Sequence, residues 1–371
     1  MKKLKKGRVV LALFILIVIL SGSLLLFKEI FTGNIDSPIK MSKNGESYET
    51  LSMLVAGNVL IDRNIYRDAI VELNEYDFNY IFEDFKEKLE NFDLKMYNQT
   101  SIIGGKALGL STSPRYNSPE EIGDAMLNLG FNVVSLANFN SFDRGEIGII
   151  NSVDYWSEKD VLYSGTYKTE DQNLLTKEKD DLKYTMLSYT TKTNFSLTKN
   201  HLVNIYSEDK IKEDLEKIKD KTDLIIVSIF WEENIVEQRK ISEYLASLGV
   251  DIIIGNNNKT IQPIDIIDDT LVIYSTGNLL SYESNVDNST GMVVSFDINI
   301  KEDQKTFENI NSELIYVFND NGNNFKVISY DDLTEEQLPN KKALYEKFSE
   351  NIRSLYKTIT ISKLGEWLWK Y

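Results

Sequence analysis

The sequence predicts an α/β fold, in which helices flank a largely parallel sheet. Short apolar runs alternate with amphipathic stretches along most of the chain, a pattern typical of strand–helix–strand units. After Gly291 three longer apolar segments follow one another with turn residues between them, which indicates an antiparallel extension of the sheet. The 371 residues are 42% hydrophobic, enough to bury a large core.

Eight apolar runs in the first part of the chain are predicted to be strands, because each is short, rich in Val, Ile, Leu or Tyr, and bounded by polar residues. These runs are residues 51–56, 93–97, 132–136, 161–163, 184–189, 224–229, 251–254 and 271–275. The three strands expected after Gly291 are residues 292–300, 313–318 and 325–330, with a turn at residues 319–322.

Helices are predicted between these strands. Ser118 is expected to cap a helix that has Pro119 at its first position, Glu121 as the capping-box glutamate, and its end at Leu129 before Gly130. Two further helices are indicated by apolar side chains at helical spacing, which are Ile211, Leu215 and Ile218, and then Ile241, Tyr244, Leu245 and Leu248. A last helix is expected over residues 333–356, interrupted near Pro339.

The composition excludes several classes of function. Lys and Arg number 41 against 57 Asp and Glu, a net charge of −16. The first 28 residues hold six cations and no acid, so the remainder carries −22 and would repel the phosphates of nucleic acid. Cysteine is absent, which excludes disulfides, thiol nucleophiles and cysteine metal sites. His201 is the single histidine, so no site can be built from several imidazoles.

The N-terminus predicts a membrane anchor. Residues 9–27 form an uncharged run of 19 residues, long enough to cross a hydrocarbon core of about 30 Å. Five cations within residues 1–8 precede it, and the positive-inside rule then keeps the N-terminus in the cytoplasm and places the C-terminal domain outside the cell membrane. The alternative is a cleaved signal peptide with small residues at 21–23.

A linker is expected over residues 28–49, followed by the main domain at residues 50–300. Residues 301–371 are predicted to complete that domain with strands and a helix. Their aromatic tail, residues 365–371, is expected to dock on the domain, with contact to a membrane or partner as the alternative.

Amide side chains recur in the loops that follow the predicted strands. Ligands collect at such loops in open α/β sheets, and asparagine in six of them is more than common turn chemistry explains. The candidate binding residues are Asn58, Asn98, Thr100, Asn138, Asn140, Trp231, Asn234, Asn256, Asn257, Lys259 and Asn278. Trp231 fits a stacking platform in a binding cleft and core packing equally well.

Residues 50–350 resemble the CapA/PgsA-like capsule synthesis proteins of the poly-γ-glutamate system. The most specific segments are Ser135-Leu136-Ala137-Asn138 through Asp143-Arg144-Gly145, Gly249 to Gly255 through Gln262-Pro263, Tyr274-Ser275-Thr276-Gly277-Asn278, and Tyr116-Asn117-Ser118-Pro119-Glu120. The resemblance implies a calcineurin-like metallophosphoesterase fold, a four-layer α-β-β-α sandwich behind one transmembrane helix.

The positions of the family's metal ligands differ in this chain. Where the family has an aspartate in the first loop, this sequence has Asn58, and Thr100 replaces a glutamate. The family's Ala-Asn-Asn-His is Ala137-Asn138-Phe139-Asn140 here, and its Gly-His-His-Pro-His is Gly255-Asn256-Asn257-Asn258-Lys259. The family's His-Trp-Gly-x-Glu becomes residues 230–234, ending in Asn234.

These changes predict a protein without a two-metal catalytic centre. Such a centre needs a bridging carboxylate and several imidazoles, whereas an asparagine amide is neutral and Lys259 adds a cation. We therefore expect no catalytic residue, no metal ligand and no cofactor. A weakly held single divalent cation is the alternative, with Asp62, Asp143, Glu232 and Glu233 as its candidate ligands. His201 is expected to be an exposed loop residue.

The predicted function is a non-catalytic role in capsule or surface-polymer biosynthesis or export. The expected partners are a polymer such as poly-γ-glutamate, membrane-embedded synthase or export proteins, and the membrane itself, but no nucleic acid. Attraction of a polyanion to so acidic a body requires local cations such as Lys259 or Arg144, or bridging divalent ions. A scaffold that contacts the synthase through the anchor and the aromatic tail is one alternative, and a residual metal-dependent hydrolase of a cell-surface polymer is the other.

Overall fold

The computed structural model describes residues 40–41, 47–172, 174–257, 259–301 and 304–361, and the chain divides into two units, Met1–Tyr48 and Glu49–Tyr371. In the first unit, β1 (Lys40–Met41) pairs antiparallel with the first two residues of β2. The predicted anchor at residues 9–27 and the aromatic tail lie outside the described residues. None of the helices within the described ranges is long and apolar enough to cross a membrane.

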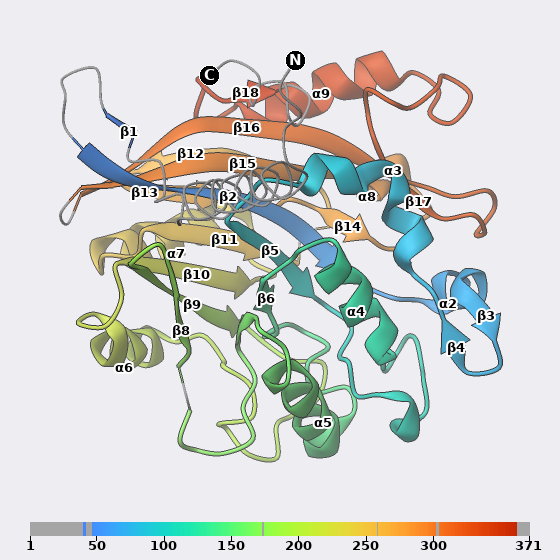
Figure 1. Ribbon diagram of the computed structural model, residues 1–371, viewed down its shortest axis with the longest axis horizontal. Coiled ribbons are helices and arrows are strands. Elements are labelled where there is room, and N and C mark those ends of the chain that lie inside the picture. The colour runs from blue at the N-terminus through green and yellow to red at the C-terminus, as the bar shows by residue number, and fades with distance from the viewer. Residues whose placement is uncertain (1–39, 42–46, 173, 258, 302–303, 362–371) are drawn as a thin grey trace, which may run out of the picture. The chain divides into compact units, whose positions relative to one another are not determined.

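The larger unit contains two sheets, as the ribbon in Figure 1 shows. The first has the order β17-β16-β15-β2-β5-β6-β7, with β14 beside β2 and β18 beside β16. Its pairs β2–β5, β5–β6 and β6–β7 are parallel, whereas β15, β16 and β17 form the predicted antiparallel extension. The strands are β2 Ser47–Val59, β5 Leu94–Gln99, β6 Val133–Ser135, β7 Leu162–Ser164, β14 Asn278–Leu280, β15 Thr290–Lys301, β16 Gln304–Phe318, β17 Lys326–Ser329 and β18 Thr360–Ile361.

The second sheet has the order β12-β13-β11-β10-β9-β8, with β9, β10, β11 and β13 parallel. Its strands are β8 Thr176–Lys179, β9 Leu182–Thr190, β10 Leu224–Phe230, β11 Ile252–Asn256, β12 Ile264–Ile267 and β13 Thr270–Ile273. All eleven predicted strands are present, and most ends differ by a few residues, but β16 begins nine residues before its predicted start. A separate hairpin is formed by β3 (Ile70–Glu72) and β4 (Glu75–Tyr76).

The side-chain alternation of the strands creates three apolar layers. In β2, Leu51, Met53 and Val55 point into a core shared with β9, β10 and β11 of the second sheet. Leu54 and Ala56 point to the opposite face, where α2–α5 pack. A third core lies between the outer face of the second sheet and α6 and α7. The unit is therefore a four-layer α-β-β-α arrangement, because each sheet buries both faces.

The helices differ from the predictions mainly in their ends. The predicted Ser118 cap is wrong: α4 begins after Pro119 without a side-chain cap, because the buried Ser118 hydroxyl donates to Ser101 Oγ at 2.7 Å. The predicted helix at residues 333–356 is shorter, since α9 starts only after Pro339. The helices are α2 Arg63–Ala69, α3 Glu83–Lys86, α4 Glu120–Asn128, α5 Gly145–Ser157, α6 Glu208–Ile218, α7 Ile235–Ser247, α8 Val286–Ser289 and α9 Lys341–Ile352, with 3-10 turns at Asn79–Phe82, Glu87–Leu89 and Lys106–Leu108.

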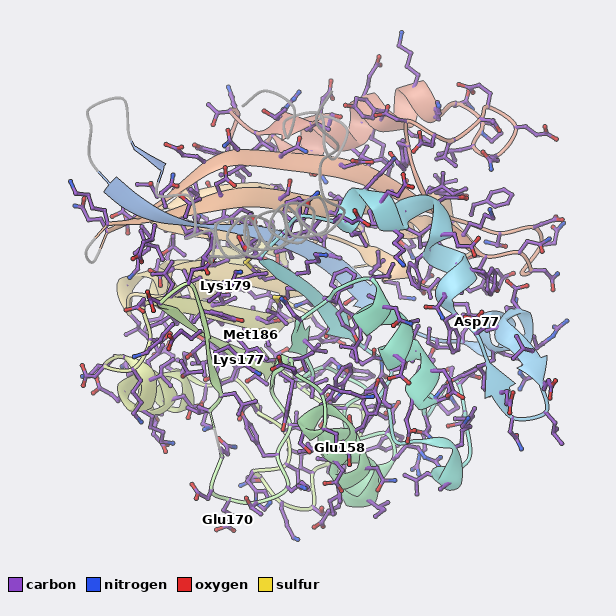
Figure 2. The ribbon with its side chains drawn as sticks, viewed as in Figure 1. Asp77, Glu158, Glu170, Lys177, Lys179 and Met186 are labelled. Carbon is purple, nitrogen blue, oxygen red and sulfur yellow. The ribbon has the colours of Figure 1, made fainter. Side chains whose placement is uncertain are left out.

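The outer strand β8 carries charged side chains that Figure 2 labels, Lys177 and Lys179. Lys177 forms a close ion pair with Asp160, and Lys179 lies 3.9 Å from an oxygen of Asp93. Met186 on the neighbouring strand β9 is buried in the core between the sheets. Lysines on an outer strand such as β8 disfavour pairing with another chain.

Candidate functional site

Amide side chains from three strands of the first sheet meet at one end of β2. The register places Asn58 beside Asn98 of β5 on one side and Asn278 of β14 on the other. Asn98 Nδ2 donates to Asn58 Oδ1 at 2.8 Å and to Thr100 Oγ1 at 3.1 Å, and Asn58 Nδ2 lies 3.3 Å from Asn278 Oδ1. All four side chains belong to buried residues. We call Asn58, Asn98, Thr100 and Asn278 the amide cluster.

The glycines beside this cluster explain how its loops approach so closely. A Cβ atom added to Gly57 would lie 2.1 Å from the carbonyl oxygen of Gly277. Gly277 itself has a φ of 71°, which favours glycine. Asn58 Nδ2 also donates to the Gly277 carbonyl at 3.2 Å. The amide cluster thus holds the β2 and β14 loops together through its own hydrogen bonds.

Asn138 and Asn140 belong to the loop that follows β6. Asn138 Nδ2 donates to the carbonyl oxygens of Gln99 at 2.9 Å and Leu136 at 3.1 Å, so it joins this loop to the end of β5. Its Oδ1 accepts the backbone N–H of Asn140 at 2.9 Å. Both asparagines are buried, and the hydrogen bonds of Asn138 determine the path of the backbone.

Asn256 lies at the end of β11 and takes part in a buried network that connects the two sheets. Its Nδ2 donates to Ser228 Oγ at 2.9 Å, and Ser228 donates in turn to Ser135 Oγ of the first sheet at 2.9 Å. Ser135 and Ser188 of β9 are also 2.9 Å apart. Ser135, Ser188 and Ser228 are not among the site residues predicted from the sequence, although their inward positions on predicted strands were a usable signal.

The side chains of the other four candidates form no hydrogen bond with the amide cluster among the described residues, although the Lys259 carbonyl lies beside Gly277. Asn257 donates to the Trp231 carbonyl at 2.9 Å, and Trp231 is 1% exposed and stacks on Tyr274, so its ring is part of the core. Asn234 is exposed and caps α7 by accepting from the backbone of residues 236 and 237. Lys259 is paired with Glu283 at 2.7 Å.

Three of the four acids proposed as ligands of a single cation have another contact, whereas Glu233 Oε2 is buried and accepts no hydrogen bond from the described residues. Asp62 caps α2, Glu232 pairs closely with Lys192, and Asp143 accepts from the backbone N–H of Tyr116 at 2.8 Å. Within the described ranges no group of three or more His, Asp or Glu side chains is placed to hold a metal ion. Neutral amides do not offset the repulsion between two dications about 4 Å apart, so the amide cluster does not fit a metal pair.

Asp143 is the most perturbed acid near these loops. Its residue is 2% exposed, and burial raises the pKa of its carboxyl group to about 6. Its hydrogen bonds with Tyr116 N–H and with Asn194 Nδ2, at 3.0 Å, and the charges of Arg115 and Arg144 oppose that rise. The carboxylate thereby joins three segments that are distant in the sequence.

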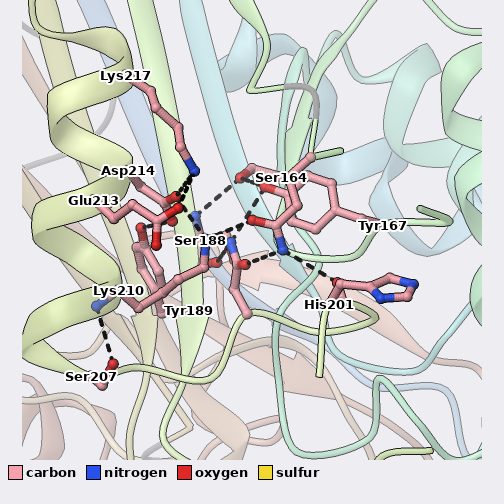
Figure 3. Close-up of polar contacts among 12 residues, drawn as sticks. Ser164, Tyr167, Ser188, Tyr189, His201, Ser207, Lys210, Glu213, Asp214 and Lys217 are labelled. Carbon is pink, nitrogen blue, oxygen red and sulfur yellow. Dashed lines mark hydrogen bonds and ion pairs between the residues drawn. The ribbon is translucent and has the colours of Figure 1, made fainter. Parts of the chain in front are cut away.

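A second buried acid, Asp214 on α6, anchors a polar network that Figure 3 draws. Its carboxylate accepts from Tyr189 Oη at 2.8 Å and from Lys210 Nζ at 2.7 Å, with Lys217 Nζ 3.4 Å away. Burial, and after it the charge of Asp214, raise the pKa of Tyr189 well above its usual value. The network fixes α6 on β9 and does not border the amide cluster.

His201 lies near this network (Figure 3), in a turn rather than in an open loop. Its side chain is 14% exposed, so the expectation of an exposed residue is wrong. The turn is held inward because Gln172 Nε2 donates to the His201 carbonyl at 3.3 Å and to Asn204 Oδ1 at 3.2 Å.

The fold and the amide cluster define a class of protein: a four-layer α/β domain with neutral side chains at the ends of its parallel strands. Residues 52–283 match the family described as "Bacterial capsule synthesis protein PGA_cap", and the chain belongs to that family. It is 23% identical over 262 residues to the "Capsule biosynthesis protein CapA" of Bacillus anthracis, covering 66% of this chain and 62% of the relative. It is 21% identical over 273 residues to the "PGA biosynthesis protein CapA" of Bacillus subtilis strain 168, covering 69% of each chain.

Two solved structures have lower similarity. A phosphatase from Mycoplasma pneumoniae shares 12% identity with a TM-score of 0.49, and the match covers 72% of this chain and 94% of the phosphatase. The calcineurin-like phosphoesterase YfkN from Bacillus subtilis shares 12% identity with a TM-score of 0.43, covering 81% of this chain and 97% of that structure.

Proposed function

We propose that this protein takes part in the synthesis or export of a capsule polymer by binding the polymer, and that it catalyses no reaction. The single observation that carries the proposal is the amide cluster. Asn58 and Thr100 stand where the family resemblance implies an aspartate and a glutamate, and the buried Asn58 is hydrogen-bonded to Asn98 and Asn278. Such side chains provide neither a bridging anion nor a titrating general acid.

The polymer that the family relationship favours is poly-γ-glutamate, an amide-linked chain with a carboxylate on every unit. The amide cluster is buried and satisfied largely by its own contacts, so we assign it the role of shaping the loops. We assign contact with the polymer to cationic and apolar side chains beside those loops. Local cations are needed because the net charge is −16.

The architecture is proposed to be that of the calcineurin-like metallophosphoesterases, with its metal ligands replaced. The four layers and the position of the amide cluster at the ends of parallel strands support this assignment. Residues 9–27 are proposed to anchor the domain at the outer face of the cell membrane, beside a membrane-embedded synthase or exporter.

The test of polymer binding is co-sedimentation of the full-length, detergent-solubilised protein with poly-γ-glutamate, with and without Mg²⁺. We expect the protein to sediment with the polymer and to remain in the supernatant with a neutral polysaccharide. Failure to associate under either condition would contradict polymer binding.

The non-catalytic part of the proposal is tested separately with the same preparation. We expect no turnover of generic phosphoesters or of γ-glutamyl amide bonds in the presence of Mn²⁺ or Zn²⁺. Turnover that depends on one of these metals would support a residual hydrolase instead.

The synthase contact is tested by pull-down from membranes. We expect an anchor-swapped variant and a variant lacking residues 365–371 to lose the membrane partner while retaining polymer binding. Retention of the partner by both variants would show that the anchor and tail are not the contact.

A further inference from the structure

A pocket of about 390 Å³ lies beside the loop that follows β6. Two arginines, Arg115 and Arg144, line it together with the rings of Phe142 and Phe195 and the side chain of Ile147. We call this the arginine pocket. Its residues come from three separate parts of the chain: the segment before α4, the start of α5, and the segment after β9.

Both guanidinium groups are held in place by contacts other than an ion pair, although their charges act on the neighbouring Asp143. Arg115 Cζ lies 4.1 Å from the ring centroid of Phe195, a cation–π contact, and Arg144 Nη2 donates to the carbonyl of Leu108. Neither arginine forms an ion pair with any Asp or Glu of the described residues. In contrast, nearby Lys199 is paired with Glu146 at 2.6 Å.

The one acid that lines the pocket, Asp143, already accepts from groups adjacent in sequence to lining residues Arg115 and Phe195. Its Oδ2 accepts from Tyr116 N–H at 2.8 Å and its Oδ1 from Asn194 Nδ2 at 3.0 Å. Asn194 Nδ2 also donates to the Pro114 carbonyl at 2.9 Å. Asp143 therefore joins the segment that carries Arg115 to the segment that carries Phe195, which preorganises the pocket before a ligand arrives.

The remaining donors of the pocket suit a carboxylate. A guanidinium group has five N–H donors in a plane and binds a carboxylate through two parallel hydrogen bonds. Arg144 precedes α5, which begins at Gly145 without a side-chain cap, so the positive end of that helix adds to the attraction. The rings of Phe142 and Phe195 provide an apolar wall for methylene groups.

The pocket and the amide-bearing loop are continuous. Asn138 and Asn140 lie at the start of the segment whose end carries Asp143 and Arg144, and Asp143 N–H donates to the Asn140 carbonyl at 3.0 Å. The backbone N–H of Asn194 donates to the Phe139 carbonyl at 2.7 Å, which joins the opposite wall to the same segment. The hydrogen bonds of Asn138 therefore support the geometry of the arginine pocket.

We propose that the arginine pocket binds carboxylate groups of an amide-linked acidic polymer, with Arg115 and Arg144 as the contacting residues. This assignment rests on the proposed function. It names the side chains whose positive charges attract an acidic polymer to a negatively charged domain. The apolar wall accommodates the two methylenes of a γ-glutamyl unit beside its carboxylate.

The test uses the full-length protein and a fluorescently labelled γ-linked glutamate oligomer, with affinity measured by anisotropy. We expect Arg115→Gln and Arg144→Gln each to weaken binding about tenfold, which corresponds to about 1.4 kcal/mol, because each variant loses charge-assisted hydrogen bonds to the carboxylate. Arg115→Lys and Arg144→Lys keep the charge but lose the planar fork, so they should fall between wild type and the Gln variants.

The matched control is the double variant Arg63→Gln/Arg67→Gln. Like Arg115→Gln/Arg144→Gln, it removes two positive charges, but it removes them from the exposed face of α2, outside the arginine pocket. We expect the control to bind like wild type. Circular dichroism and thermal unfolding of each variant identify any loss of fold.

Two further probes define the ligand. We expect the same oligomer with amidated carboxylates not to bind, and inorganic phosphate to compete weakly compared with the oligomer. Equal affinity of the folded arginine double variant and the control would overturn the pocket assignment while leaving polymer binding intact. If neither the oligomer nor the polymer binds the wild-type protein, the proposed function is overturned as well.

Discussion

Asn98 donates a hydrogen bond from its side-chain amide to Oδ1 of Asn58 at 2.8 Å, while its own Oδ1 is buried and accepts no hydrogen bond from the described residues. One asparagine thus fixes another at the centre of the amide cluster. The side chain at position 58 must therefore both accept and donate: its Oδ1 accepts from Asn98, and its Nδ2 donates to Gly277 and Asn278. A neutral amide meets both requirements.

Asn58→Asp tests this requirement. The aspartate would replace the donating Nδ2 with an oxygen that faces the Gly277 carbonyl and Asn278 Oδ1, and it would bury a charge at a site that is 4% exposed. We expect a loss of roughly 2–4 kcal/mol in the free energy of unfolding at pH 7, measured with urea.

The loss should be smaller at pH 5, where a buried aspartate is partly protonated. Asn74→Asp, at an exposed turn, serves as the control and should change stability little. Equal stability of wild type and Asn58→Asp at pH 7 would contradict the assignment of a neutral cluster.

Divalent metal should not stabilise the wild-type protein. The amide cluster contains no ionised ligand, so we expect 1 mM Mn²⁺ to leave the melting temperature unchanged within about 1 °C. A site with a Kd of about 10 μM would stabilise the fold by roughly 2.7 kcal/mol at that concentration. A saturable rise of several degrees in the melting temperature, measured by differential scanning fluorimetry, would therefore show that the protein has a tight metal site.

Asp143→Asn should alter the pH dependence of stability. The pKa of Asp143 is about 6 in the folded protein against a usual value of 3.8, so folding favours the protonated form. Protonated Asp143 therefore adds roughly 3 kcal/mol to the free energy of unfolding below about pH 4. This contribution is lost as the pH rises through about 6. The variant has no titrating group there, so its stability relative to wild type should increase between pH 4 and pH 7 in urea titrations.

Asp160→Asn provides a control of opposite sign. The ion pair with Lys177 lowers the pKa of Asp160, so the ionised carboxylate stabilises the folded protein at neutral pH. This stabilisation is lost as the pH falls below the usual pKa of 3.8. The Asp160 variant should lose a little stability relative to wild type at pH 7. Parallel pH profiles for wild type and Asp143→Asn would mean that Asp143 is not buried as described.

Asp214→Ala should destabilise the domain without affecting polymer binding. The substitution leaves the Tyr189 hydroxyl and Lys210 without their buried acceptor, which costs about 2 kcal/mol. Glu213→Ala, next to it on α6, removes an exposed acid paired with Lys217 and should have little effect. A similar denaturation midpoint for both variants would show that the network in Figure 3 does not anchor α6.

Much of the fold was accessible from the sequence because strands and amphipathic helices depend on local periodicity. Leu51, Met53 and Val55 alternate with Leu54, and the structure sends the two sets into different cores. Ser118 shows where local reasoning fails. Its cap motif is complete in sequence, yet the hydroxyl bonds to Ser101, which no spacing rule connects to it.

The sequence by itself determined the acidic body, the apolar N-terminal run, the absence of cysteine and the recurrence of asparagine in the loops after the predicted strands. Tertiary structure alone decided that Asn58, Asn98 and Asn278 bond to one another, that Trp231 belongs to the core, and that Arg115, Arg144 and Phe195 share a pocket. The reason is physical: periodic burial is a property of neighbouring residues, whereas a pocket or hydrogen-bonded cluster depends on distances between segments that only packing brings together.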